Sequence, residues 1–231
     1  MTLKQSHLPS AAAMLVRRSS LFLSAAYYRN SEMSPWESTI WRKRRQVQSL
    51  SRAQSSRFAL LCVEHAFRSS KAYFQCRLDA ALLDRVDEII GFLWKQIIRT
   101  NKRELDPVIS ELERLTPSED DEEDLVWGWG YVPSGLAAAA CCLRGKKAGE
   151  YALKSAGEAY SCIAHQVSSK RIYSHGEGIA GDEIDELERD SNRCMREVRF
   201  QNTCLQLLAK GERLTQAFLH QTDTHGTSPD E

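Results

Sequence analysis

The sequence predicts an all-α protein, and three observations carry that prediction. Apolar residues recur at steps of three and four through several long segments, which is the period of an amphipathic helix. Only 6 prolines and 12 glycines punctuate the 231 residues, which is too few for a turn-rich β-sandwich. No stretch alternates strand and helix patterns as a parallel sheet requires. We therefore expect a single compact bundle of about six to eight helices.

Composition and charge narrow the class of protein further. Hydrophobic residues make up 42% of the chain and charged residues 27%, which is typical of a globular domain and not of a membrane span or a disordered chain. Lys and Arg together number 31, as do Asp and Glu. The net charge therefore gives no reason to expect a nucleic-acid or membrane partner, and we expect neither.

The cysteines predict a reducing compartment. Seven is an odd number, and no two of the cysteines form a C-x-x-C pair, which does not suit a secreted disulfide scaffold. Most of them fall within apolar periodic stretches, where a free thiol behaves as a small hydrophobic side chain. We predict unbridged, mostly buried thiols in a cytoplasmic protein.

The two ends of the chain differ from its centre. The first 56 residues hold nine Lys or Arg and only two acids. Residues 1–35 are predicted to be a poorly ordered basic leader, either a transit peptide or sequence upstream of the true start. Residues 36–220 are predicted to form the helical domain. Residues 221–231, with their Thr, His, Gly, Ser and Pro, are predicted to be a disordered tail.

Three helices are predicted in the first half of the domain. From Phe58 onward the apolar spacing fits one helical face, and the clearest stripe predicts a second helix over 78–99. A third helix is predicted to begin at Asp106-Pro107, because Asp can accept an N-cap hydrogen bond and Pro suits the first helical position. Pro117 marks its end.

Two segments with small side chains are predicted to pair. The helix that opens at Pro133-Ser134 and the helix over 150–168 both carry alanines at helical spacing. Small side chains let two backbones approach closely, so we expect these helices to pack as an antiparallel pair around Gly145.

The longest helix is predicted over 182–210. Its seam residues step alternately by three and four, an average period of about 3.5 that marks left-handed helix packing. Ser191 occupies one place in this seam. Gly211 is predicted to end the helix, and a short helix over 214–220 is predicted to close the domain.

The most unusual segment joins an acidic run to alternating aromatics and glycines. The aromatics stand at every second position, which suits an extended linker. Aromatic side chains anchor protein interfaces, and acids beside them complement a basic partner. The alternative is that the rings plug the end of the bundle. The candidate binding surface comprises Asp120, Asp121, Glu122, Glu123, Asp124, Trp127, Trp129 and Tyr131.

A catalytic interpretation of the acids is the alternative. Asp120, Asp121 and Asp124 match the D-D-x-x-D pattern with which all-helical prenyl and terpene synthases hold magnesium and a diphosphate. No second metal-binding motif accompanies them, and acidic runs are commonly solvated faces. Cys62-x-x-His65 has ligand-like spacing, but a structural zinc site usually takes two such pairs. We assign no metal, cofactor or catalytic residue, although a Cys–His pair that meets in space stays open.

Three polar side chains are predicted to face the core. Glu64 lies beside the apolar face that begins at Phe58, Gln201 interrupts the seam of the longest helix, and Glu197 is one turn before it. Buried polar groups need hydrogen-bond partners, and a polar break in a seam often fixes register. We expect these three residues to be structural.

A series of residues, taken in order, points to a family. The series comprises Leu50, Phe58, Glu64, Tyr73-Phe74, Trp94, Pro117-Ser118, Asp120-Asp121, Gly130-Tyr131-Val132-Pro133, Glu197, Gln201 and Cys204-Leu205-Gln206-Leu207-Leu208. In this order and spacing the body, from Leu50 to Leu214, resembles the YjaG-like family, an all-helical bacterial family of unknown function. The resemblance implies a compact helical bundle in the bacterial cytoplasm. The leader before Trp36 has no counterpart at the family's usual start, and Ala53 stands where an aromatic is expected.

Together these observations favour a non-catalytic protein that acts by binding another protein. One version is an immunity or antitoxin-like protein whose acidic, aromatic surface covers a basic cleft on a toxin. The magnesium-dependent enzyme is one alternative, and a homo-oligomer built on the long seam helix is another.

Overall fold

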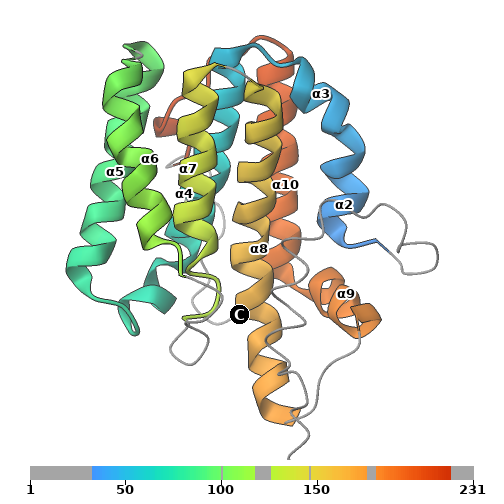
Figure 1. The fold of residues 1–231 in the computed structure, drawn as a ribbon. Helices are drawn as coiled ribbons and strands as arrows, with labels where there is room; N and C mark the ends of the chain where they lie inside the picture. Colours follow the sequence, from blue (N-terminus) through green and yellow to red (C-terminus); the bar gives the residue numbers. More distant parts are fainter. Residues whose placement is uncertain (1–32, 100, 118–125, 146, 176–180, 220–231) are drawn as a thin grey trace, which may run out of the picture.

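The computed structural model confirms the all-α fold, since the elements of its described residues are helices and none is a strand (Figure 1). The structure describes the backbone of residues 33–99, 101–117, 126–145, 147–175 and 181–219. Side chains are described for these residues except 170–175 and 181–182. Almost all of the predicted leader, and the predicted tail, lie outside the described residues.

The elements follow one another in a simple order. They are α2 (Pro35–Thr39), η1 (Trp41–Lys43), α3 (Arg44–Ser49), α4 (Arg52–Gln75), α5 (Ala80–Ile98), α6 (Lys102–Leu115), α7 (Tyr131–Arg144), α8 (Ala148–His175), α9 (Gly181–Asp190) and α10 (Asn192–Ala209). Within the described part, none of these helices combines the length and the apolar character needed to cross a membrane.

Helix α4 is the centre of the bundle. It packs against α5, α7, α8 and α10, and in Figure 1 it passes behind α7, with α5 and α6 to one side and α8 and α10 to the other. Every residue from Phe58 to Phe67 is buried. A helix buried on all sides must satisfy its polar side chains internally, so Glu64 and His65, which lie in this stretch, need partners within the protein.

The structure confirms the predicted pairing of the two small-residue helices. Gly145, between α7 and α8, has φ +96°, the left-handed conformation that glycine adopts at a helix C-terminus. A Cβ at Gly135 of α7 would collide with the Val63 side chain of α4, so α7 packs closely on this side chain. The Ser155 hydroxyl of α8 lies 3.0 Å from the Gly135 carbonyl and 3.1 Å from that of Ala59 in α4. Three helices therefore meet at this point.

The prediction that the third helix begins at Asp106-Pro107 is wrong. Helix α6 begins four residues earlier, at Lys102, and its N-cap is Asn101, whose side chain accepts a hydrogen bond of 3.2 Å from the Arg103 amide. Pro107 lies inside the helix. It is exposed, as is Arg103, so water can solvate the one carbonyl whose helical partner is missing.

The prediction of one continuous helix over 182–210 is also wrong. The chain breaks at Ser191, which has φ −76° and ψ 115° and accepts a hydrogen bond from the Cys194 amide as the N-cap of α10. Serine bonds readily to nearby backbone amides, and this local preference outweighs the seam period. The predicted end at Gly211 is confirmed, because its φ is +88° and paired backbone bonds close the helix.

The segment after α10 folds back onto the bundle. The short helix predicted over 214–220 is a single turn at 217–219 within the described residues. Leu214 and Leu219 are buried, and the Phe218 ring packs near that of Phe200 in α10, with centroids 6.2 Å apart. Burial of these side chains fixes the segment against α10.

Candidate functional site

The aromatic part of the predicted binding surface forms a tight turn. The structure places Trp127, Trp129 and Tyr131, whereas the five acids Asp120, Asp121, Glu122, Glu123 and Asp124 lie outside the described residues. The expectation of an extended linker is wrong, because the Trp129 amide donates a 2.9 Å hydrogen bond to the Val126 carbonyl. Gly128 makes the turn possible with a φ of +84°.

The three aromatic rings of this segment face different directions. Trp129 is only 5% exposed and meets Phe74 of α4 edge to face, with ring centroids 5.5 Å apart. Trp129 therefore plugs the bundle and offers no ring to a partner in this structure. Trp127 and Tyr131 are half-buried at the surface, on either side of this anchor.

Trp127 and Tyr131 share a neighbour that the sequence does not reveal, His165 of α8. The Tyr131 hydroxyl lies 2.8 Å from the His165 Nε2, and the two rings meet edge to face at 4.7 Å. The Trp127 ring centroid is 6.3 Å from that of His165. We call these three residues the aromatic surface. No periodicity links residue 165 to residue 131, so only the fold brings them together.

The backbone of α8 holds the turn in place. A Cβ at Gly128 would lie 2.5 Å from the Cys162 carbonyl oxygen, so glycine is required for this approach as well as for its φ. One turn further along α8, the Gln166 side chain is buried and accepts a 2.8 Å hydrogen bond from Arg193 of α10. The aromatic surface therefore stands on a rigid support.

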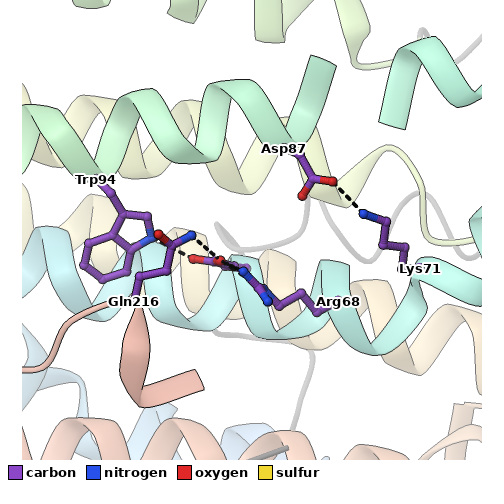
Figure 2. A network of polar contacts seen from close by, with 6 residues as sticks. Arg68, Lys71, Asp87, Trp94 and Gln216 are labelled. Carbon is purple, nitrogen blue, oxygen red and sulfur yellow. Dashed lines mark hydrogen bonds and ion pairs between the residues drawn. The ribbon is translucent and has the colours of Figure 1, made fainter. Parts of the chain in front are cut away.

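The predicted polar core residue Glu64 forms a clamp between three parts of the chain (Figure 2). Its Oε1 accepts hydrogen bonds from Arg68 Nε (2.9 Å) and NH2 (2.6 Å) and from Gln216 Nε2 (2.7 Å), and its Oε2 accepts one from Trp94 Nε1 (2.6 Å). Glu64 is 1% exposed. Both of its carboxylate oxygens bind donors within the protein, which ties α4 to α5 and to the C-terminal segment.

Glu197 and Gln201 form a second buried network. Glu197 Oε2 lies 2.6 Å from His65 Nδ1, and Glu197 Oε1 accepts a 2.9 Å hydrogen bond from Gln201 Nε2. Gln201 also donates to the Ala156 carbonyl and accepts from Trp36 Nε1, at 3.0 and 2.9 Å. The network connects α2, α4, α8 and α10. Its amide and carboxylate groups are used for structure, as the sequence predicts for these residues.

The Cys62–His65 pair lacks the features of a nucleophile or a metal site. Burial raises the pKa of the Cys62 thiol well above its usual range, and negative charge at Cys204 and Glu197 raises it further. The thiol is therefore protonated, whereas the thiolate is the form that attacks as a nucleophile. The sequence offers Cys76 or His175 as a further ligand for this pair. Cys76 stands 14 positions after Cys62, about 21 Å along the helix axis, and the side chain of His175 is not described. No group of three metal-ligating side chains occurs among the described residues.

All seven cysteines lie in the described part, and each is free. Five are buried as predicted, Cys141 is half-buried and Cys76 is exposed. Burial raises the pKa of Cys162 and of Cys194 to about 12. At mildly alkaline pH only about one such thiol in ten thousand is a thiolate.

We expect iodoacetamide to modify Cys76 first when the folded protein is treated at mildly alkaline pH. The five buried thiols are both shielded and protonated, so they should react only when the fold opens. Mass spectrometry of the alkylated peptides over time measures the order. In denaturant all seven should react at similar rates. Modification of Cys62 or Cys204 as fast as Cys76 in the folded protein would contradict the described burial.

Comparison with known proteins identifies no relative, since no protein-family model, curated protein or solved structure matches the chain. The resemblance to the YjaG-like family therefore stays a prediction.

Proposed function

We propose that this protein is a non-catalytic binding protein that contacts a partner protein through the aromatic surface of Trp127, Tyr131 and His165. The observation that carries the proposal is that the surrounding structure holds this surface in a fixed position. Trp127 lies in a turn that Gly128 and the buried Trp129 anchor. Tyr131 follows the turn as the first residue of α7, and the ring of His165 in α8 lies near both aromatic rings. Aromatic side chains with a fixed position lose little entropy on binding and are common energetic centres of interfaces.

Charge near this surface favours a basic partner. The acidic run from Glu119 to Asp124 ends three positions before Trp127 in the sequence. Helix α9, which packs on α8, carries six acids and one arginine. Negative charge beside aromatic anchors gives complementarity to a basic protein surface and accelerates encounter. One form of this proposal is an immunity or antitoxin-like role against a basic toxin. We also propose that the protein is a member of the YjaG-like family.

The magnesium-dependent enzyme has less support. Its three aspartates, Asp120, Asp121 and Asp124, lie outside the described residues. Three of the four buried carboxylates that are described have identified partners: Glu64 and Glu197 in the two networks, and Glu188 with the Tyr160 hydroxyl at 2.8 Å. The fourth, Asp185, also has a contact. The geometry therefore favours the binding hypothesis.

We expect Trp127→Ala to weaken partner binding at least tenfold, because truncation of an aromatic anchor typically costs about 2 kcal/mol. The test is affinity capture from the native host with the full chain, followed by calorimetric titration of the purified partner. Tyr131→Ala should also weaken binding. Tyr151→Ala, a half-buried tyrosine near the opposite end of α8, is the matched control and should leave the affinity unchanged.

Two results would count against this function. The first is a reproducible partner that Trp127→Ala and wild type bind equally well, since the aromatic surface would then play no part. The second is a partner affinity that rises with salt, because attraction between an acidic surface and a basic one must weaken as salt screens it.

A further inference from the structure

The neutral chain separates its charges in space. Two stretches, residues 33–63 and 191–219, together hold eleven Lys or Arg and three Asp or Glu. Helix α9, directly before the second stretch, has the opposite character with six acids and one arginine. A balanced composition therefore conceals one strongly basic part and one strongly acidic part.

The fold brings the two basic stretches side by side. Lys43 Nζ of η1 donates a 2.5 Å hydrogen bond to Asn202 Oδ1 of α10, and Gln54 Nε2 of α4 donates one of 2.6 Å to the Leu208 carbonyl. The segment after α10 lies against the same helix through Phe218. The second half of α10 therefore lies between η1 on one side and the start of α4 with the C-terminal segment on the other.

The outer face of α10 and its C-cap carry cations and uncharged side chains but no acid. Its exposed positions include Arg199, Thr203, Gln206 and Lys210, which step by three and four residues and so share one face. The one acid of this helix, Glu197, is buried and bound to His65. No carboxylate of α10 is therefore available to neutralise this face.

Six cations of this region have no acidic partner among the described residues. We define the basic surface as Arg42, Arg45, Arg57, Arg199, Lys210 and Arg213, of which Arg57 is half-buried and the others exposed. None of the six takes part in an ion pair within the described part of the chain.

Elsewhere on the protein, several cations are paired with acids. Arg68, Lys71, Arg85, Arg144 and Lys147 all contact carboxylates. On the basic surface, burial lowers the pKa of Arg57 and the positive charge of Arg213 lowers it further. The fold therefore places positively charged side chains next to one another, although the whole chain has as many acids as bases.

We propose that the basic surface binds the phosphate backbone of a nucleic acid without reading its sequence. Five of its six cations are arginines, whose planar guanidinium matches the geometry of a phosphate. The surface extends over η1, α3, α4, α10 and the segment after α10 instead of converging on one point, which fits an extended polyanion and not a single phosphate group. Arg199 and Lys210 alone are separated by about 16 Å along α10, or about five nucleotide steps.

A membrane surface fits this region less well. Peripheral membrane binding needs apolar side chains that enter the lipid as well as positive charge. The exposed large hydrophobic residues of the described part are Met33 and Ile98, and neither belongs to the basic surface. The net charge of the whole chain argues against a nucleic-acid partner, whereas the local distribution of charge supports one.

The experiment is a titration of labelled single-stranded RNA and labelled duplex DNA with the full chain, followed by fluorescence anisotropy at about 50 mM and about 200 mM salt. We expect binding at the lower salt and a steep loss at the higher. Arg199→Gln with Lys210→Gln should weaken binding at least tenfold and reduce the salt slope by about 2, one for each lost phosphate contact.

Matched variants keep the test specific. Lys95→Gln with Arg103→Gln removes two exposed cations from α5 and α6, and this variant should bind as wild type does. Arg42→Gln with Arg45→Gln, in η1 and α3, should also weaken nucleic-acid binding. Because these substitutions leave α10 unchanged, misfolding of α10 cannot explain that loss of affinity. Trp127→Ala should keep nucleic-acid affinity, so failure of this proposal and failure of the proposed protein-binding function are distinguishable.

Four results would overturn the proposal. One is no binding of either nucleic acid at the lower salt, and another is equal loss in the α5–α6 control, which would reflect net charge alone. A third is competition by polyglutamate as effective as by unlabelled RNA, which would indicate an acidic protein as the ligand. The last is tighter binding to anionic phospholipid vesicles than to either oligonucleotide.

Discussion

Glu64→Gln is expected to destabilise the fold by about 3 kcal/mol. The Glu64 carboxylate accepts four hydrogen bonds, from Arg68, Trp94 and Gln216. A glutamine has the same shape but one acceptor oxygen, so its NH2 group must face one of these donors. It also leaves the partly buried Arg68 guanidinium, 31% exposed, without a counter-charge. Urea unfolding followed by circular dichroism measures the change.

Two further variants separate the clamp from a general effect of charge. Glu113→Gln neutralises an exposed glutamate on α6 and should change stability by less than about 0.5 kcal/mol. Trp94→Phe removes one donor and keeps most of the ring, so it should cost about 1 to 2 kcal/mol. If Glu64→Gln is as stable as wild type, the clamp contributes no net stability and the C-terminal segment is held by its apolar residues alone.

The helical architecture could be predicted from the sequence because it depends on local patterns. The small residues around Gly145 identify the α7–α8 pair, and Gly211 identifies the end of α10. The boundaries that the sequence misplaced, at Asn101 and Ser191, are those where a side-chain cap decides the end of a helix. The hydrophobic period of the sequence continues past such a residue, whereas the helical conformation of the backbone ends there.

The candidate sites were harder to predict because their residues come from distant parts of the chain. The sequence shows that Glu64 and Gln201 need partners, but Trp94 and Trp36 become their donors only when the helices pack. Likewise, the alternation of aromatics suggests one surface, yet Gly128 turns Trp129 inward. A local pattern identifies a residue that needs a contact, and the tertiary fold chooses the contact.

The charge distribution illustrates the same point at a larger scale. Equal totals of acids and bases predict no polyanionic partner. Packing then places η1 beside α10 and brings together two stretches that hold eleven Lys or Arg and three Asp or Glu, while the opposite charge is concentrated in α9 and the run before Trp127. Net charge describes the whole molecule, whereas recognition of a charged partner depends on the electrostatic field of the one surface that the partner contacts.

Gly128→Ala is expected to destabilise the protein by roughly 3 kcal/mol and to displace the aromatic surface. Two costs add at this position. A φ of +84° is unfavourable for alanine, at about 1 kcal/mol. The new methyl group would also lie 2.5 Å from the Cys162 carbonyl oxygen, and this atom belongs to the backbone of α8 and cannot rotate away. Overpacking of this kind costs about 1 to 3 kcal/mol.

Other glycines of the same chain allow the two costs to be measured separately. Gly211 has φ +88° with no atom within 4 Å of an added Cβ, so Gly211→Ala should cost only about 1 kcal/mol. Gly91 lies within α5 with equally open surroundings, and Gly91→Ala should stabilise the protein by about 0.5 to 1 kcal/mol. The excess of Gly128→Ala over Gly211→Ala in urea unfolding then measures the contact with α8. If the two variants lose equal stability, the turn is not held against α8, and the rigid mounting on which protein binding by Trp127 and Tyr131 depends is absent.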